Sequence, residues 1–157
     1  MKKILLVIAI ALFSVSFSFA QDANAMKDSG NVKTQEKSLY ERLGGYDALA
    51  AVTDDFLGRL LKDKMFAKFF VGASNDSKKK IRQHIVDFLC MATGGPCVYG
   101  GRSMKVSHEG LGITKEEWDA SAKHLIATLD KFKVPEKEKG EVLTAIGGLE
   151  KDIVEKK

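Results

Sequence analysis

His108 is the residue of this chain whose surroundings most favour chemistry. It lies in the stretch MKVSHEG, residues 104–110, directly downstream of a loop rich in glycine. An imidazole on such a short stretch of backbone can offer one ring nitrogen to a metal while a partner on the other nitrogen fixes the ring. The position therefore suits a single axial ligand to a flat metal cofactor. The competing interpretation is ordinary, because a lone histidine in a helical domain is usually a surface or core residue.

The elements that must position His108 are predicted to be helices. Apolar residues recur at helical spacing, and no segment alternates convincingly with period two, so we predict an all-α fold without internal repeats. The last helix opens at Pro135 and carries an apolar stripe that ends at Ile153. The other main helices are predicted over residues 46–62, over 78–92, and from Thr114 to about Phe132.

Two helix starts and one short turn complete this outline. Ser38 with Glu41, and Thr114 with Glu117, have the spacing of capping boxes. A short helical turn over 104–109 is expected to carry His108.

The first 20 residues are typical of an export signal. A basic start at 1–3 is followed by an uncharged apolar run and by small residues before Ala20, after which cleavage is expected. A retained membrane anchor is the alternative, but the run is short for a span. Residues 21–37 are predicted to be a disordered leader, and 38–157 one domain. We therefore expect an exported, periplasmic protein without stable membrane association after cleavage.

The charge of the chain does not indicate a nucleic-acid partner. The formal net charge is +4, and cleavage after Ala20 removes Lys2 and Lys3 and no acid, which leaves +2. A short basic run at 78–80 has no interleaved aromatic residues and no accompanying binding motif, so a solvated helix start explains it better.

The two cysteines, Cys90 and Cys97, are compatible with a disulfide in an exported chain. The turn between them contains Gly94, Gly95 and Pro96, which could bring the sulfurs together. Two reduced cysteines are the alternative. The sequence has neither CxxC nor CxxCH, so neither a thioredoxin-type site nor covalent c-type haem attachment is supported.

Four segments together resemble the truncated haemoglobins, specifically their group I branch. They are LYERLGG at 39–45, FF at 69–70, TGGP at 93–96 with YGGRSM at 99–104, and HEGLGI at 108–113. The resemblance covers about residues 38–154. It implies a truncated globin fold, a two-over-two helical sandwich around haem b, with the glycine pairs freeing the backbone to turn.

On this resemblance His108 is the proximal iron ligand. Phe70 and Phe69 would pack on the porphyrin, Phe88 would line the distal helix, and Met104 would lie near the proximal face. The full set expected to contact the cofactor is Phe56, Leu57, Phe69, Phe70, Ile81, His84, Ile85, Phe88, Met104, His108 and Trp118.

The distal side departs from the family pattern. Leu57 stands where many members have a tyrosine, and Ile81 and Ile85 stand where several have glutamine, so the usual oxygen-stabilising network is expected to be absent. In some cyanobacterial relatives a histidine at the position of His84 ligates the iron. His84 is accordingly a candidate second metal ligand with His108, and the alternative places it at the haem edge near a propionate.

These residues favour a haem protein that binds the diatomic gases O₂, NO or CO reversibly. If both histidines ligate the iron, an electron carrier with a redox partner is the alternative. Chemistry on nitric oxide or peroxide has little support, because no acid–base partner beyond His84 occupies the pocket positions. A helical adaptor without cofactor remains the alternative of a different class.

Overall fold

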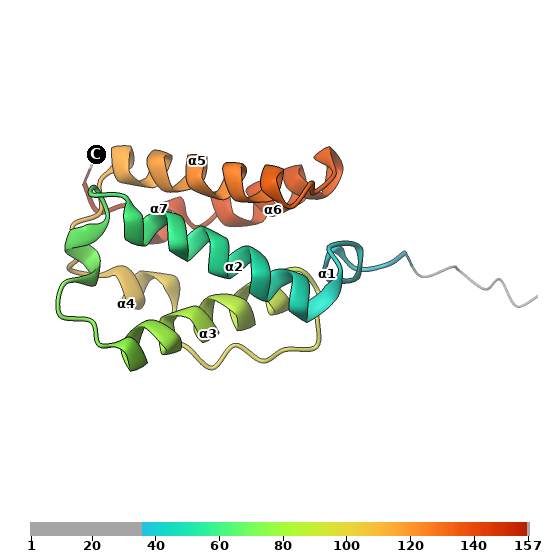
Figure 1. Ribbon diagram of the computed structural model, residues 1–157, viewed down its shortest axis with the longest axis horizontal. Helices are drawn as coiled ribbons and strands as arrows, with labels where there is room; N and C mark the ends of the chain where they lie inside the picture. The colour runs from blue at the N-terminus through green and yellow to red at the C-terminus, as the bar shows by residue number, and fades with distance from the viewer. Residues whose placement is uncertain (1–35, 157) are drawn as a thin grey trace, which may run out of the picture. The chain divides into compact units, whose positions relative to one another are not determined.

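The computed structural model describes residues 36–156, and every element of regular structure found there is helical (Figure 1). The all-α prediction is confirmed for this part of the chain. The predicted signal peptide and residues 21–35 of the predicted leader lie outside the described residues. None of the described helices is long and apolar enough to cross a membrane. The elements are α1 (Leu39–Arg42), α2 (Gly45–Lys62), the 3-10 helix η1 (Ala67–Phe70), α3 (Asn75–Ala92), α4 (Met104–His108), α5 (Lys115–Lys131), α6 (Glu136–Gly147) and α7 (Glu150–Ile153).

Two antiparallel helix pairs, α2 with α3 and α5 with α6, form the framework (Figure 1). The helix α2 joins them, because it packs against both α3 and α5. One core cluster contains Val52, Leu125, Leu129 and Val142, and the apolar side chains between the pairs leave a cavity of about 120 Å³. The apolar side chains between the two pairs therefore do not fill the space completely.

Side-chain caps stand at the starts of α1, α3, α4 and α5. Both predicted capping boxes are present, at Ser38 with Glu41 and at Thr114 with Glu117. The start of α3 was predicted at Lys78, which is wrong by about one turn. The hydroxyl of Ser74 accepts a hydrogen bond from the Ser77 backbone N–H at 3.1 Å, so the helix begins directly after this cap.

The first glycine pair lies where α1 gives way to α2. Gly44 and Gly45 have φ values of +98° and +78°. Side chains are disfavoured in this left-handed region, so the abrupt turn between the two helices requires glycine. This is the role that the resemblance predicted for the pair.

The predicted last helix is interrupted, so the expectation of one continuous helix is wrong. It divides into α6 and α7 at Gly147 and Gly148. Each glycine lowers helix propensity by about 1 kcal/mol relative to alanine. The change of direction buries Ile153 and lets the following residues pair with the backbone beside Thr114.

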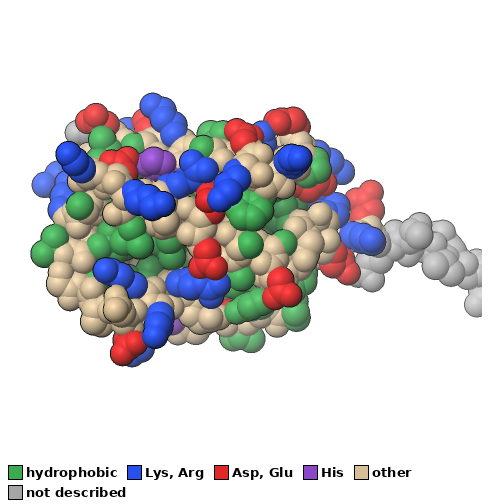
Figure 2. Space-filling model, viewed as in Figure 1, with side chains coloured by type: hydrophobic (Ala, Val, Ile, Leu, Met, Phe, Trp, Pro, Cys, Tyr) green, Lys and Arg blue, Asp and Glu red, His purple; other side chains and the backbone are tan. Residues whose placement is uncertain are grey.

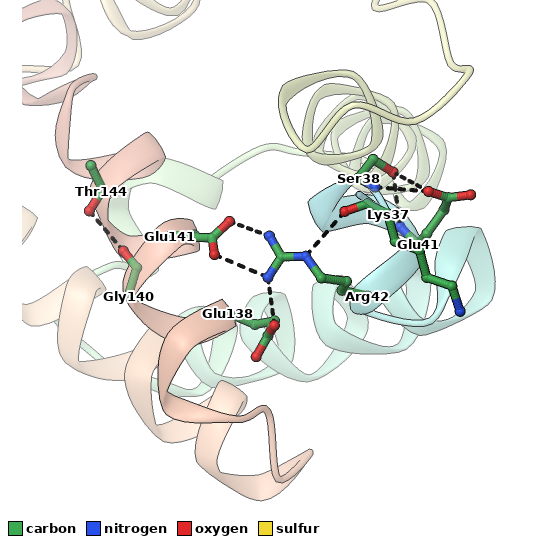
Figure 3. Close-up of polar contacts among 8 residues, drawn as sticks. All are labelled: Lys37, Ser38, Glu41, Arg42, Glu138, Gly140, Glu141 and Thr144. Atoms are coloured by element: carbon green, nitrogen blue, oxygen red, sulfur yellow. Dashed lines mark hydrogen bonds and ion pairs between the residues drawn. The ribbon is translucent and has the colours of Figure 1, made fainter. Parts of the chain in front are cut away.

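Arg42 fastens α1 to α6 (Figure 3). Its guanidinium donates to Glu138 at 2.5 Å and to both carboxylate oxygens of Glu141, one of them at 3.0 Å. These contacts, first with Glu141 and then with Glu138, raise the pKa of Arg42, and the guanidinium lowers the pKa of the Glu141 carboxyl. The segment before the first glycine pair is therefore tied to the second helix pair.

A disulfide bond joins Cys90, near the end of α3, to Cys97 in the loop that leads to α4. Of the two states that the sequence allowed, the structure has the oxidised one. Cys90 is fully buried and belongs to a core cluster with Leu49 and Leu89, whereas Cys97 is half-buried. The bond therefore anchors the start of the loop to the core.

Candidate functional site

His108 is the last residue of the short helix α4. Its half-buried ring places Nδ1 2.7 Å from the backbone oxygen of Met104, one turn earlier. A carbonyl oxygen only accepts hydrogen bonds, so Nδ1 carries a proton, and the neutral form of this imidazole has its lone pair on Nε2. Among residues 36–156, Nε2 has no hydrogen-bond partner. This is the state that an axial metal ligand requires.

The loop that follows His108 is fastened by the C-terminal segment. The carboxylate of Glu155 accepts hydrogen bonds from the backbone N–H groups of Gly110 at 2.6 Å and Gly112 at 2.8 Å. The Glu155 backbone N–H donates to the carbonyl of Ile113 at 2.9 Å, and α7 packs against α4. Sequence analysis missed this role of Glu155, because the contact joins segments far apart in the chain. The backbone that carries His108 is thus held at its C-terminal end.

The residues predicted for the distal side share one face of α3. Ile81, His84, Ile85 and Phe88 are spaced by three or four residues, which places them along one side of a helix. Ile81 and His84 are exposed, while Ile85 and Phe88 are half-buried, and Ile85 also packs against the core cluster that contains Cys90. The four residues therefore form one stripe along α3, and its N-terminal part is exposed.

Tyr99, from the loop between α3 and α4, contacts two of these side chains. Its ring centroid lies 6.1 Å from that of His84 and 5.4 Å from that of Phe88, with interplanar angles of 79° and 78°. Both are edge-to-face contacts, which aromatic rings prefer. Sequence analysis gave Tyr99 no role of its own. The signal available was a single aromatic residue inside a glycine-rich loop directly before the His108 helix.

The aromatic pair Phe69 and Phe70 lies in η1 and is half-buried. Lys68 beside them forms an ion pair at 2.5 Å with Glu117, a buried residue in the first turn of α5. The Lys68 ammonium, followed by the Thr114 backbone N–H, holds the pKa of the Glu117 carboxyl below its ordinary value. Glu117 therefore stays ionised at neutral pH, and the ion pair fixes η1 against α5.

Two predicted pocket residues lie on α2. Leu57 is buried, with 8% of its surface exposed, and Phe56 packs against the core cluster that contains Val52. An apolar side chain at position 57 offers no hydrogen bond, as expected from the sequence.

Five predicted pocket residues are half-buried and pack against neither core cluster: Phe69, Phe70, Phe88, Met104 and Trp118. They come from η1, α3, α4 and α5. Figure 2 shows apolar side chains gathered in a hollow of the face between α2 and α3, with basic side chains around it. Half-buried apolar side chains, together with one imidazole nitrogen that makes no hydrogen bond, are the groups that a planar apolar cofactor carrying a metal requires. These residues therefore fit a haem.

The remaining histidine, His124, has a structural role, as predicted. Its Nε2 lies 2.8 Å from a carboxylate oxygen of Asp63, and its ring packs edge-on against Phe66. This contact links the end of α2 to α5. His124 is the last histidine in the sequence, so no histidine in α6 or α7 can form a covalent link to a haem.

Two stacked antiparallel helix pairs with a histidine on a short helix define the class of the protein, a two-over-two globin. The family model described as Bacterial-like globin matches residues 38–155. The chain therefore belongs to the globins, and its relatives place it in the group 1 truncated haemoglobins.

The relatives are similar over most of their length. The group 1 truncated haemoglobin of Mycolicibacterium paratuberculosis is 38% identical, with 77% of this chain and 87% of the relative covered. The corresponding protein of Synechocystis sp. is 40% identical, with 70% and 90% covered. These shares leave little of either relative without a counterpart here.

Two solved structures share the fold. The truncated haemoglobin of Tetrahymena pyriformis in its Fe(III) form is 30% identical, with a TM-score of 0.70 and 76% of this chain and 100% of that chain covered. The 2/2 haemoglobin of Synechococcus sp., in the cyanomet state and with covalently attached haem, is 35% identical, with a TM-score of 0.68 and 75% and 98% covered. The predicted two-over-two fold is confirmed.

Proposed function

We propose that this chain binds haem b without a covalent bond and that its iron takes up diatomic gases reversibly. The observation that carries the proposal is the hydrogen bond from His108 Nδ1 to the Met104 carbonyl, which leaves Nε2 as an unprotonated ligand. The ring is fixed before any iron binds, so little ordering is needed when the coordinate bond forms. The Tetrahymena and Synechococcus structures support an iron-bound haem in this fold.

The residues around His108 would hold the group by apolar contact. Met104 and Trp118 would pack on the His108 side, and the phenylalanines of η1 and α3 would pack on the ring. The haem supplies an iron with a site for the gas. Leu57, Ile81 and Ile85 offer no hydrogen bond to a bound ligand, and one missing hydrogen bond costs about 1 kcal/mol. We therefore expect easy release of oxygen, which favours reversible binding over reactions that retain it.

The electron-carrier alternative requires His84 to reach the iron and a redox partner to approach. The ring of His84 is exposed and lies edge-on against Tyr99. This position supports an iron that keeps its sixth site for a gas molecule.

We further infer that the protein is exported to the periplasm. The basic, apolar and small-residue pattern of residues 1–20 and the disulfide between Cys90 and Cys97 both support an oxidising compartment. The measurement is the N-terminal sequence of the protein recovered from the periplasmic fraction, which should begin at Gln21. Recovery of the uncleaved chain from the cytoplasm would contradict export.

An absorption spectrum of the purified protein with added haem tests the main proposal. We expect a Soret band, a single broad visible band in the ferrous form without ligand, and a spectral shift on adding carbon monoxide. Split visible bands in the ligand-free ferrous form would instead favour bis-histidine ligation and electron transfer. A Soret band that keeps the position and shape of free haem after the protein is added would exclude a haem function and favour an adaptor.

A further inference from the structure

We propose that Tyr99 holds the imidazole of His84 away from the iron and so determines whether the iron has five or six ligands. The inference rests on the haem-binding function proposed above. A residue of the loop between α3 and α4 would then set the number of iron ligands. Tyr99 would be a positioning residue, since it acts on the iron through His84.

The contact surface is built from two side chains of α3 that lie one turn apart. Both His84 and Phe88 make edge-to-face contacts with Tyr99. The ring centroids lie 6.1 Å apart for His84 and Tyr99 and 5.4 Å apart for Phe88 and Tyr99. The contact with Phe88 fixes Tyr99 along the helix, because both rings are half-buried. His84 is more exposed than either Phe88 or Tyr99, so its ring has the most space in which to turn.

Tyr99 is itself held in place by its own loop. Its hydroxyl donates a hydrogen bond to the carbonyl of Arg102 at 2.7 Å. Gly101 lies so close to the ring that a Cβ there would stand 2.4 Å from the Tyr99 hydroxyl oxygen, which explains the glycine. Two residues before Tyr99, Cys97 is bonded to Cys90 of α3. The ring is therefore a fixed surface against which His84 rests.

The consequence is a competition between two positions of one imidazole. For His84 to bind the iron, its ring must break the edge-to-face contact with Tyr99, or the loop that carries Tyr99 must move together with His84. An edge-to-face aromatic pair favours the contacting state by about two- to twelvefold. This preference is small, but it is sufficient to decide between five- and six-coordinate iron if the two states have similar free energies.

The test compares three variants of the full chain loaded with haem. Tyr99→Leu removes the ring, Tyr99→Phe keeps the ring and removes only the hydroxyl, and Tyr99→Leu combined with His84→Leu removes both partners. Tyr99→Leu should raise the ratio of six- to five-coordinate ferrous iron by about two- to twelvefold, seen as split visible bands. Tyr99→Phe should stay close to the parent protein, because the contact with Phe88 and the bond between Cys90 and Cys97 still hold the ring after the hydroxyl is lost. The double variant should return to the single broad band.

A second measurement needs no haem. In the apoprotein, the ring-current shift that Tyr99 imposes on the His84 ring protons should be present in the parent and in Tyr99→Phe and lost in Tyr99→Leu. Its presence in Tyr99→Phe also shows that the loop still folds.

The outcomes separate this inference from the function it rests on. Failure of the parent protein to bind haem overturns both. Normal haem binding overturns the role of Tyr99 alone if the parent is already six-coordinate through His84, or if Tyr99→Leu leaves the visible bands unchanged. Six-coordinate iron that persists in the double variant also overturns it, because the sixth ligand would not be His84.

Discussion

Replacing His108 by alanine is expected to abolish stable haem binding. In the proposed site, the Nε2 of this residue supplies the bond from protein to iron, and the remaining contacts are apolar. Removing a group that only hydrogen-bonds to a metal ligand lowers the affinity for the metal by about 10- to 100-fold. Removing the ligand itself should lower the affinity for haem by more than that. The measurement is a titration of the apoprotein with haem, followed by Soret absorbance, with the parent protein as reference.

A matched control for this substitution is His84→Ala, which should leave haem bound because His108 is untouched. Far-ultraviolet circular dichroism of both apoproteins would show that the helices persist. Replacement of His108 by glycine gives a further control, because free imidazole can then enter the vacated space and restore the Soret band. Wild-type haem affinity in His108→Ala would mean that another side chain holds the iron, and the proposed ligand would be wrong.

Features encoded by local sequence could be predicted well. The capping boxes at Ser38 and Thr114 involve partners three residues away, so spacing alone identified both helix starts. The short helix that carries His108 could be predicted because its surroundings form a continuous motif, and the Nδ1 contact of His108 lies within the same turn.

Features that depend on distant contacts could not be predicted. The break at Gly147 and Gly148 was missed because the apolar stripe of the last helix continues through it to Ile153. What selects the break is the pairing of the C-terminal segment with the loop after α4, including the contacts of Glu155. The contact of Tyr99 with α3 could not be predicted either, since an irregular loop brings these residues together.

Reduction of the bond between Cys90 and Cys97 is expected to lower the free energy of unfolding by about 2.5 kcal/mol, from the loop-closure entropy of an eight-residue ring. Domains of this size are stable by about 5–15 kcal/mol, so the change should be large. The physical reason is that the bond restricts the unfolded chain. Guanidinium unfolding of the apoprotein, with and without a dithiol reductant, measures the difference through the transition midpoint.

The variant Cys97→Ser provides the control for that experiment. It removes the bond at its half-buried end, whereas a serine in place of the fully buried Cys90 would also bury a hydroxyl. Cys97→Ser should unfold at the midpoint of the reduced parent and should not respond to the reductant. Equal midpoints for oxidised and reduced parent would mean that the packing of Cys90 against Leu49 and Leu89, which survives reduction, already holds the end of α3.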